Sequence, residues 1–404
     1  MSPAGSFESL QAAIQGGADA VYFGIDQLNM RARSGNNFSI EDLSRIVKIC
    51  SEKKIKTYLT LNTIIYDHDV TLMKTIIKAA KENKVDAIIA GDQSVLGYAK
   101  SIGMPVHIST QANVSNIESV MFFSAFADTI VLARELSLRQ VADIVKQIKR
   151  SSIKGPSGEL IKIEIFAHGA LCMAVSGKCY LSLHSHNASA NRGACIQNCR
   201  RDYIVKDKEE GIEFEIDNEY IMSSKDLCTI DFMDKVIESG VNILKIEGRG
   251  RPADYVYTTT KCYREAIDSY YEKTYTEEKI VKWKNELSTV FNRDFWDGYY
   301  LGKKMGEWSD EYGSKATKKK IYIGKGIKYF SRQNVAEFKL ESHQLAVGNN
   351  ILIVGPTTGV IEDKITELRI EDAVVDSVSK GDVFSFPLNK KIRPSDKLYK
   401  VIDA

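Results

Sequence analysis

Short apolar runs recur between residues 1 and 250, and segments with helical periodicity separate them. Strands and helices that alternate in this way are typical of βα units, whose strands lie parallel in one sheet. The apolar runs predict strands at residues 18–24, 54–62, 85–92, 105–114, 128–135, 162–170, 220–223 and 242–249. Eight strands with helices between most of them predict a TIM-type (β/α)8 barrel, and a doubly wound open sheet is the alternative.

The alternation stops at residues 171–219, an interval too long for an ordinary βα loop. Long segments of this kind in compact domains are usually functional. A helical, aromatic-rich extension follows at 252–290, and the sequence as far as 307 is assigned to the barrel domain. Residues 308–320 are polar and resemble a linker. Short β-rich runs separated by turn signals over 321–404 then predict a small antiparallel β-barrel domain.

Polar side chains occupy one face of several predicted strands, where apolar branched residues normally fill a barrel. Residues two apart on a strand point the same way. The polar residues that share a face or end a strand are Tyr58, Thr60, Asn62, Asp92, His107, Ser109, Gln111, Asn113, Arg134, Glu135, Glu164, His168, Lys245, Glu247 and Arg249. A buried polar group without a partner costs roughly 1–3 kcal/mol. The set therefore predicts a ligand cavity at the C-terminal mouth, although each single member is equally well explained as a paired core residue.

The cations in this set suit an anionic substrate. The candidate substrate-binding residues are Asn62, Asp92, Gln111, Asn113, Arg134, Lys225, Lys245 and Arg249. The alternative for the cations is structural, because Glu135, Glu164 or Glu247 could pair with them.

Composition adds limits to the class of protein. The 404 residues are 44% hydrophobic and 27% charged, and the net charge of +2 argues neither for nor against nucleic-acid binding. No run of 18 apolar residues predicts a membrane span, and the first residues lack the features of a signal peptide. We therefore expect a cytoplasmic protein without a membrane partner.

Five of the seven cysteines lie between Cys172 and Cys228. Six residues separate Cys172 from Cys179, which does not fit the short spacings of zinc ribbons, whereas four soft thiolates suit an iron–sulfur cluster. We expect Cys172, Cys179, Cys195 and Cys199 to bind the metal, with Cys228 as the alternative fourth ligand. A nucleophilic Cys172 activated by His168 is the competing interpretation, but it leaves the other cysteines unexplained.

Several motifs together resemble peptidase family U32. They are the segments 2–5, 164–172, 176–182, 191–195 and 245–249, with Cys199-Arg200 and Asn292-Arg293. The resemblance covers residues 2–302, and the β-rich tail resembles the family's C-terminal module. The family was named for collagenase-like proteases, but other branches hydroxylate tRNA uridine, ribosomal RNA cytidine or a quinone precursor without oxygen. Residues 168–174, the Cys195/Cys199 pair and residues 224–227 look most like the tRNA branch.

This resemblance implies a 4Fe–4S cluster, prephenate as the dicarboxylate that supplies the hydroxyl group, tRNA as the partner, and 5-hydroxyuridine at the wobble position as the product. It leaves open a reductase or other partner protein. The candidate catalytic residues are His168, Glu164 and Glu247, and His168 lies four residues before Cys172, placed to donate a proton near the cluster. The main alternative is a collagenase-like peptidase or a peptide-binding protein. In one departure from the family, the residues usual before Ser2 are missing, so the first strand is truncated or begins upstream.

Overall fold

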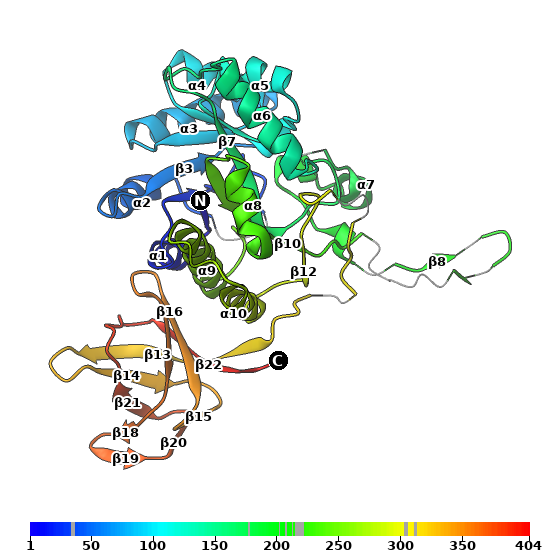
Figure 1. The fold of residues 1–404 in the computed structure, drawn as a ribbon. Coiled ribbons are helices and arrows are strands. Elements are labelled where there is room, and N and C mark those ends of the chain that lie inside the picture. The colour runs from blue at the N-terminus through cyan, green and yellow to red at the C-terminus, as the bar shows by residue number, and fades with distance from the viewer. Residues whose placement is uncertain are drawn as a thin grey trace.

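A computed structural model describes residues 1–33, 37–176, 178–201, 203–206, 208–211, 213–214, 222–302, 306–310 and 313–404. It is a mixed α/β structure in which helices surround a parallel sheet, and a separate group of antiparallel strands lies at the C-terminal end of the chain (Figure 1). No helix in the described part of the chain is both long enough and apolar enough to cross a membrane.

The parallel sheet is built from strands that pair in chain order. Its strands are β1 (Ser2–Ala4), β2 (Ala20–Phe23), β3 (Lys56–Thr60), β4 (Ala87–Ala90), β5 (Val106–Ile108), β6 (Thr129–Val131), β7 (Lys162–Ala170) and β11 (Ile243–Ile246). β11 pairs in parallel with β7. On the other side, the Ile246 amide donates to the Met1 carbonyl at 3.1 Å. The last parallel strand thus contacts the residue that precedes the first.

Amphipathic helices connect these strands. They are α1 (Phe7–Gln15), α2 (Asp42–Ser51), α3 (Val70–Glu82), α4 (Gln93–Ser101), α5 (Ile117–Ser124), α6 (Leu138–Arg150), α8 (Met233–Glu238), α9 (Ala253–Tyr271) and α10 (Glu277–Ser288). Side-chain caps begin several of them, such as Ser137, which with Gln140 forms a capping box at the start of α6. The apolar sides of the helices and the strands form one continuous core.

The predicted strand at 220–223 is the main error in the expected sheet. Residues 220 and 221 lie outside the described residues, and the next strand is β10 (Asp226–Cys228). β10 runs antiparallel to β7 and pairs in parallel with β12 (Phe295–Trp296). The eighth parallel strand is instead β1. The other seven predicted ranges each contain one observed parallel strand.

The cysteine-rich interval 171–219 contains short elements in its described parts. They are α7 (Leu181–His186), the 3-10 helices η3 (Ala190–Arg192) and η4 (Asn198–Arg200), and the paired strands β8 (Val205–Lys206) and β9 (Glu213–Phe214). In Figure 1, α7 lies beside the sheet, and β8 belongs to an arm that extends away from it. The described residues around the cysteines contact the end of β7, where Arg200 donates a hydrogen bond to the Leu171 carbonyl.

The C-terminal strands form mostly antiparallel sheets with their own apolar core. They are β13 (Lys318–Phe330), β14 (Val335–Leu340), β15 (Gln344–Ala346), β16 (Asn350–Gly355), β17 (Gly359–Lys364), β18 (Leu368–Ile370), β19 (Ala373–Val375), β20 (Ser377–Ser379), β21 (Val383–Pro387) and β22 (Lys397–Asp403). β13 begins within the last three residues expected to form the linker. A small C-terminal β domain fits these strands, while the exact domain boundaries stay a prediction.

Candidate active site at the C-terminal ends of the strands

A cavity of about 240 Å³ lies where the parallel strands end. Thr60 ends β3, Ala170 ends β7, and Ser109 and Glu247 directly follow β5 and β11; all four line the cavity. Active sites of α/β proteins form at this end of a parallel sheet because the loops there converge. The predicted cavity therefore has the location that the strand pattern indicated.

Positive charge dominates the lining. Among the described lining residues, one carboxylate, Glu247, accompanies the cations Arg31, Arg134, Arg200, Lys245, Arg249, Arg251 and Arg293. Arg31, Lys245 and Arg293 have carboxylate partners, but the other lining arginines form no ion pair with another described residue. Buried charges without partners are costly, so this excess of positive charge favours an anionic ligand.

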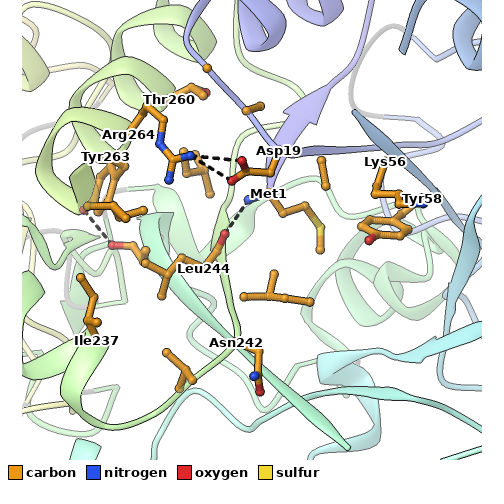
Figure 2. Close-up of a pocket in the computed structure, with 18 of the residues that line it drawn as sticks. Met1, Asp19, Lys56, Tyr58, Ile237, Asn242, Leu244, Thr260, Tyr263 and Arg264 are labelled. Carbon is orange, nitrogen blue, oxygen red and sulfur yellow. Dashed lines mark hydrogen bonds and ion pairs between the residues drawn. The ribbon is translucent and has the colours of Figure 1, made fainter. Parts of the chain in front are cut away.

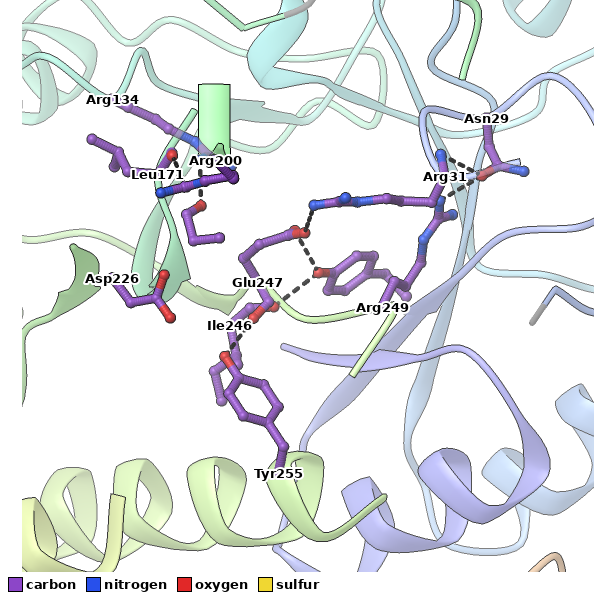
Figure 3. A network of polar contacts seen from close by, with 12 residues as sticks. Asn29, Arg31, Arg134, Leu171, Arg200, Asp226, Ile246, Glu247, Arg249 and Tyr255 are labelled. Atoms are coloured by element: carbon purple, nitrogen blue, oxygen red, sulfur yellow. Dashed lines mark hydrogen bonds and ion pairs between the residues drawn. The ribbon is translucent and has the colours of Figure 1, made fainter. Parts of the chain in front are cut away.

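Glu247 connects two parts of the lining. One of its oxygens lies 3.0 Å from the Arg31 guanidinium, and the other accepts a hydrogen bond from the Tyr22 hydroxyl at 3.2 Å. Figure 3 shows the Arg31 side chain reaching toward this carboxylate. Burial alone would raise the pKa of Glu247, but the charges of Arg31 and Arg134 lower it to about 2. Glu247 is thus ionised near neutral pH and suited to hold cations rather than to donate a proton.

Arg249 hydrogen-bonds to neutral partners and not to Glu135, Glu164 or Glu247, the partners of the structural alternative. Its guanidinium donates to the Thr60 hydroxyl and to Asn29 Oδ1, and the side chain is buried. Burial lowers the pKa of Arg249 to about 10, although Tyr22 and Glu247 oppose this shift. For Arg31, burial would also lower the pKa, but the adjacent Glu247 raises it. Arg249 is therefore the cation whose charge has the weaker internal compensation.

Arg134 and Arg200 lie near the end of β7. Arg134 donates to the Ala170 carbonyl at 3.0 Å and stacks over Phe166 at 3.8 Å, while its buried Nε has no hydrogen-bond partner among the described residues. Arg200 donates to the Leu171 carbonyl at 2.7 Å, as Figure 3 shows. Both guanidinium groups are thus fixed mainly by backbone carbonyls, which leaves their charge available to a ligand.

Lys245 contributes a different arrangement. Its Nζ lies 2.8 Å from Glu164, which is fully buried, and His107 Nδ1 lies 3.7 Å from the other Glu164 oxygen. Burial would raise the pKa of Glu164, but Lys245 and His107 lower it to about 2. Glu164 is not among the residues that line the cavity. Its position suits the holding of Lys245 better than the catalytic role expected for it.

The four predicted metal ligands lie in one neighbourhood. Cys172, Cys195 and Cys199 line the cavity, and no disulfide joins them. Burial raises the pKa of Cys199, and the nearby Cys172, Cys195 and Cys179 add to this effect. Among the described residues, no three His, Cys, Asp or Glu side chains converge tightly enough to hold a single metal ion. The cysteine-ligated metal therefore stays a prediction.

Cys228, the alternative ligand, lies elsewhere. It is buried on β10 opposite His168 of β7, and its sulfur accepts a hydrogen bond from the Tyr263 hydroxyl at 3.7 Å. Burial raises the pKa of its thiol to about 11. The geometry therefore favours Cys199 over Cys228 as the fourth member of the group.

His168 does not line the cavity, contrary to the expectation that it shares a face with Phe166. The pairing of β7 with β11 shifts at this point, so that Lys245 is opposite Phe166 but Ile246 is opposite His168. The bulge turns His168 away from the cavity. Its ring packs against Tyr255, Tyr263 and Phe295, and burial lowers its pKa to about 3. A neutral, enclosed imidazole is poorly placed to donate a proton to a ligand.

Three further predicted residues have structural partners outside the lining. Asp92 caps α4 through Ser94 and also accepts from the Ile65 amide. Asn113 has a φ of 52° and ends a short 3-10 turn. Lys225 forms ion pairs with Asp294 at 3.2 Å and Glu307 at 3.3 Å. Asn62 and Gln111, by contrast, do line the cavity, where they hydrogen-bond to each other at 3.3 Å.

The strand pattern missed Arg31, Arg200, Arg251 and Arg293, because none of them lies on a predicted strand; Arg200 ends η4 and the other three lie in loops. A signal was present for two of them, since Arg200 and Arg293 belong to the motifs Cys199-Arg200 and Asn292-Arg293. Arg31 lies after β2 and Arg251 after β11, where loops of a parallel sheet commonly supply binding residues.

A second cavity, of about 300 Å³, lies near the starts of the strands (Figure 2). Ala20, Lys56 and Ile243, which begin β2, β3 and β11, help to line it. Its most prominent polar contact is the ion pair between Arg264 and Asp19 at 3.1 Å. None of the candidate catalytic, substrate-binding or metal-binding residues lines this cavity, but Tyr58, one of the polar strand residues expected at the other end of the sheet, does.

Comparison with known proteins relates the chain to one family. Peptidase family U32 matches residues 5–310. The chain is 58% identical to a protein named collagenase from Porphyromonas gingivalis, over 99% of this chain and 97% of that one. It is 30% identical to tRNA hydroxylation protein P1 of Bacillus subtilis, over 99% and 94%. It is 34% identical to the 23S rRNA 5-hydroxycytidine C2501 synthase of Escherichia coli, over 68% and 40%. The chain belongs to peptidase family U32.

Proposed function

We propose that this chain is an oxygen-independent RNA hydroxylase that forms 5-hydroxyuridine at the wobble position of tRNA. The observation that carries the proposal is one cavity in which three cysteines meet seven cations. Relatives named for hydroxylation of tRNA and ribosomal RNA support an enzyme that acts on RNA. The motifs 168–174 and 224–227 favour tRNA within that class.

The proposed site rests on a TIM-type (β/α)8 barrel. We infer this closed form because each of the eight parallel strands has a neighbour on both sides once β11 contacts Met1. The cavity would then occupy the mouth at which barrel enzymes carry their active sites. The described loops from β2, β3, β5, β7 and β11 all contribute to its lining.

Cys172, Cys179, Cys195 and Cys199 would hold a 4Fe–4S cluster at the cavity wall. When bound, such a cluster supplies one-electron chemistry. Three of these cysteines share the lining with cations, and positive charge of this kind also offsets the negative charge of thiolate ligands. Anaerobic purification tests the cluster, because it should give a brown protein that contains about four iron atoms and four sulfides per chain. A colourless protein that contains only zinc would exclude the cluster.

A dicarboxylate, with prephenate as the proposed hydroxyl source, would bind among the arginines. A cavity of about 240 Å³ suits a small metabolite, and planar guanidinium groups bind carboxylates through two parallel hydrogen bonds. Arg249 and Arg134 would grip the carboxylates, while Glu247 keeps Arg31 in place. Asn62 and Gln111 offer neutral hydrogen-bonding groups at the same wall.

The second candidate function is a collagenase-like peptidase or a peptide-binding protein. The 58% identity to a protein named collagenase favours it. However, no histidine occurs among the described lining residues, and Cys172 therefore lacks the base that a thiol nucleophile usually requires. Hydroxylation of ribosomal RNA or of a quinone precursor would use the same cavity with a different acceptor.

The decisive experiment is deletion of the gene followed by mass spectrometry of bulk tRNA nucleosides. Loss of 5-hydroxyuridine derivatives, restored by the wild-type gene but not by a Cys195→Ser variant, is the expected result. Unchanged tRNA together with a loss of hydroxylated ribosomal RNA or quinone would move the protein to another branch of the family. Normal nucleosides and quinones, with loss of gelatin cleavage, would support the peptidase instead.

A further inference from the structure

Two exposed aromatic side chains, Tyr66 and Tyr180, lie on segments that also contribute residues to the cavity lining, and the proposed chemistry does not use them. We call this pair the aromatic rim. Tyr66 is 49% exposed and follows β3 in the loop that begins at Asn62, a lining residue. Tyr180 is 72% exposed and lies beside Cys179. Singly exposed apolar side chains are ordinary on protein surfaces, so the contacts and charge around these two decide what they can do.

The two aromatic segments meet at Asn191. Its carbonyl accepts a hydrogen bond from the Ile64 amide at 3.2 Å, and its side chain accepts from the Cys179 amide at 3.0 Å. One residue therefore joins the loop that carries Tyr66 to the segment that carries Tyr180. Asn191 lies four residues before Cys195, which lines the cavity.

Tyr66 is held rigidly with part of its surface open. The Arg192 guanidinium lies 4.0 Å from the ring centroid, and it is fixed in turn by two contacts with Asp69, at 2.6 Å and 3.3 Å. Asp69 also accepts from the Tyr66 amide at 2.9 Å. Arg192 thus supports one side of the ring, while half of the side chain remains exposed. A fixed ring with an open face is pre-organised for stacking, because little rotamer entropy is lost on binding.

The charge of the segment indicates the class of partner. Residues 172–201 include Lys178, Arg192, Arg200 and Arg201 but no aspartate or glutamate. The Tyr66 loop adds Asp67 and Asp69, and Asp69 pairs with Arg192, so the net positive charge comes from Lys178, Arg200 and Arg201. Exposed aromatics combined with cations are features by which proteins bind single-stranded nucleic acid.

We propose that Tyr66 and Tyr180 stack against unpaired RNA bases that flank the nucleotide entering the cavity. This inference rests on the proposed RNA hydroxylase function and adds the residues that would position the RNA. Tyr66 and Tyr180 are positioning residues, since the reacting atoms would lie in the cavity beyond them. Recognition through base faces tolerates many sequences, so cavity contacts would have to select the modified base.

The test measures the affinity of the anaerobically purified, cluster-loaded protein for a fluorescein-labelled single-stranded RNA of about a dozen nucleotides, a length within the reach of known single-strand binding sites. Tyr66→Ala and Tyr180→Ala should each weaken binding about 5- to 150-fold. Tyr66→Phe should bind like the wild type because it keeps the ring. Phe122→Ala, which removes an aromatic side chain 65% exposed on α5, is the matched control and should have no effect.

The two proposals fail in different ways. If the wild type does not bind RNA, the proposed function itself is wrong. If the wild type binds but Tyr66→Ala and Tyr180→Ala match Phe122→Ala, the stacking inference is overturned. Tyr66→Leu separates stacking from folding, because it keeps apolar bulk without a planar ring; wild-type affinity in this variant would also refute stacking. Loss of gelatin binding with unchanged RNA binding would assign the rim to a peptide.

Discussion

Replacement of Arg249 by methionine should weaken anion binding without weakening the fold. Arg249 is buried and donates only to Thr60 and Asn29, so no carboxylate loses its ion-pair partner when the charge is removed. Both acceptors keep another hydrogen bond, because Thr60 donates to the Phe23 carbonyl and Asn29 Oδ1 accepts from the Arg31 amide. Methionine has a similar length and suits an irregular buried space.

The pKa of Arg249 indicates how much the replacement should change the free energy of unfolding. A decrease from 12.5 to about 10 means that burial of this charge costs roughly 3 kcal/mol, and the lost hydrogen bonds offset much of that gain. We therefore expect the free energy of unfolding of Arg249→Met to stay within about 1 kcal/mol of the wild type or to exceed it. The affinity for prephenate should decrease about 10- to 100-fold, because a charged hydrogen bond is worth roughly 1.5–3 kcal/mol.

Arg31→Met is the matched control, and we expect it to lower the stability that Arg249→Met leaves unchanged or raises. It leaves the buried Glu247 without its 3.0 Å ion pair, and we expect a loss of about 2–4 kcal/mol, somewhat below the range for fully buried pairs because the Arg31 side chain is 30% exposed. Urea denaturation supplies both stabilities, and isothermal titration with prephenate supplies the affinities. Destabilisation of Arg249→Met by more than about 2 kcal/mol, or unchanged prephenate binding, would refute the reasoning. Wild-type affinity in Arg249→Lys would show that charge alone suffices and that the planar fork is not used.

Three other predictions concern the surrounding residues. Lys245→Met should destabilise the protein by about 3–5 kcal/mol at pH 7, because Glu164 stays buried without its partner. In the wild type, the stability contributed by Glu164 is present above pH 4.5 and is lost as the pH falls toward about 2. In Lys245→Met, the Glu164 carboxyl should instead have a raised pKa. The free energy of unfolding lost by this variant, measured by urea denaturation, should therefore be smaller at pH 4.5 than at pH 7, and an equal loss would contradict this account. Cys199→Ser should lose bound iron in a colorimetric assay while Cys228→Ser retains it, and the reverse result would exchange their roles. His168→Ala should lower the melting temperature, because it empties a packed site among tyrosines, yet leave prephenate affinity unchanged; a selective loss of that affinity would return His168 to the cavity.

The strand pattern predicted the location of the cavity but not all of its residues. Alternation is a local property, so it correctly grouped Lys245, Glu247 and Arg249 near one strand end. It failed at His168 because one extra residue on β7 reverses the faces beyond it, and no local signal in the apolar pattern marks such a bulge.

For the cysteines, the fold separates two candidates that the sequence left undecided. Their spacing in the sequence could not decide between Cys199 and Cys228, because that choice depends on which side of β7 each residue occupies. The antiparallel pairing of β10 places Cys228 opposite His168, away from the other thiols. Asp92 and Lys225 lie outside the cavity lining for a related reason: a polar residue at a strand end can cap the next helix or pair across a loop as well as bind a ligand.

The C-terminal strands share apolar core with the helices that surround the parallel sheet. Leu352 and Val360, from β16 and β17, are buried in the main core rather than in that of their own domain. Gln15 at the end of α1 donates to the Thr358 carbonyl and accepts from the Val360 amide, each at 2.8 Å. Cleavage before Lys318 would therefore expose an apolar surface on α1 and α9 in addition to removing strands. Calorimetry of the full chain should show a single cooperative transition, and a separately expressed N-terminal fragment should aggregate.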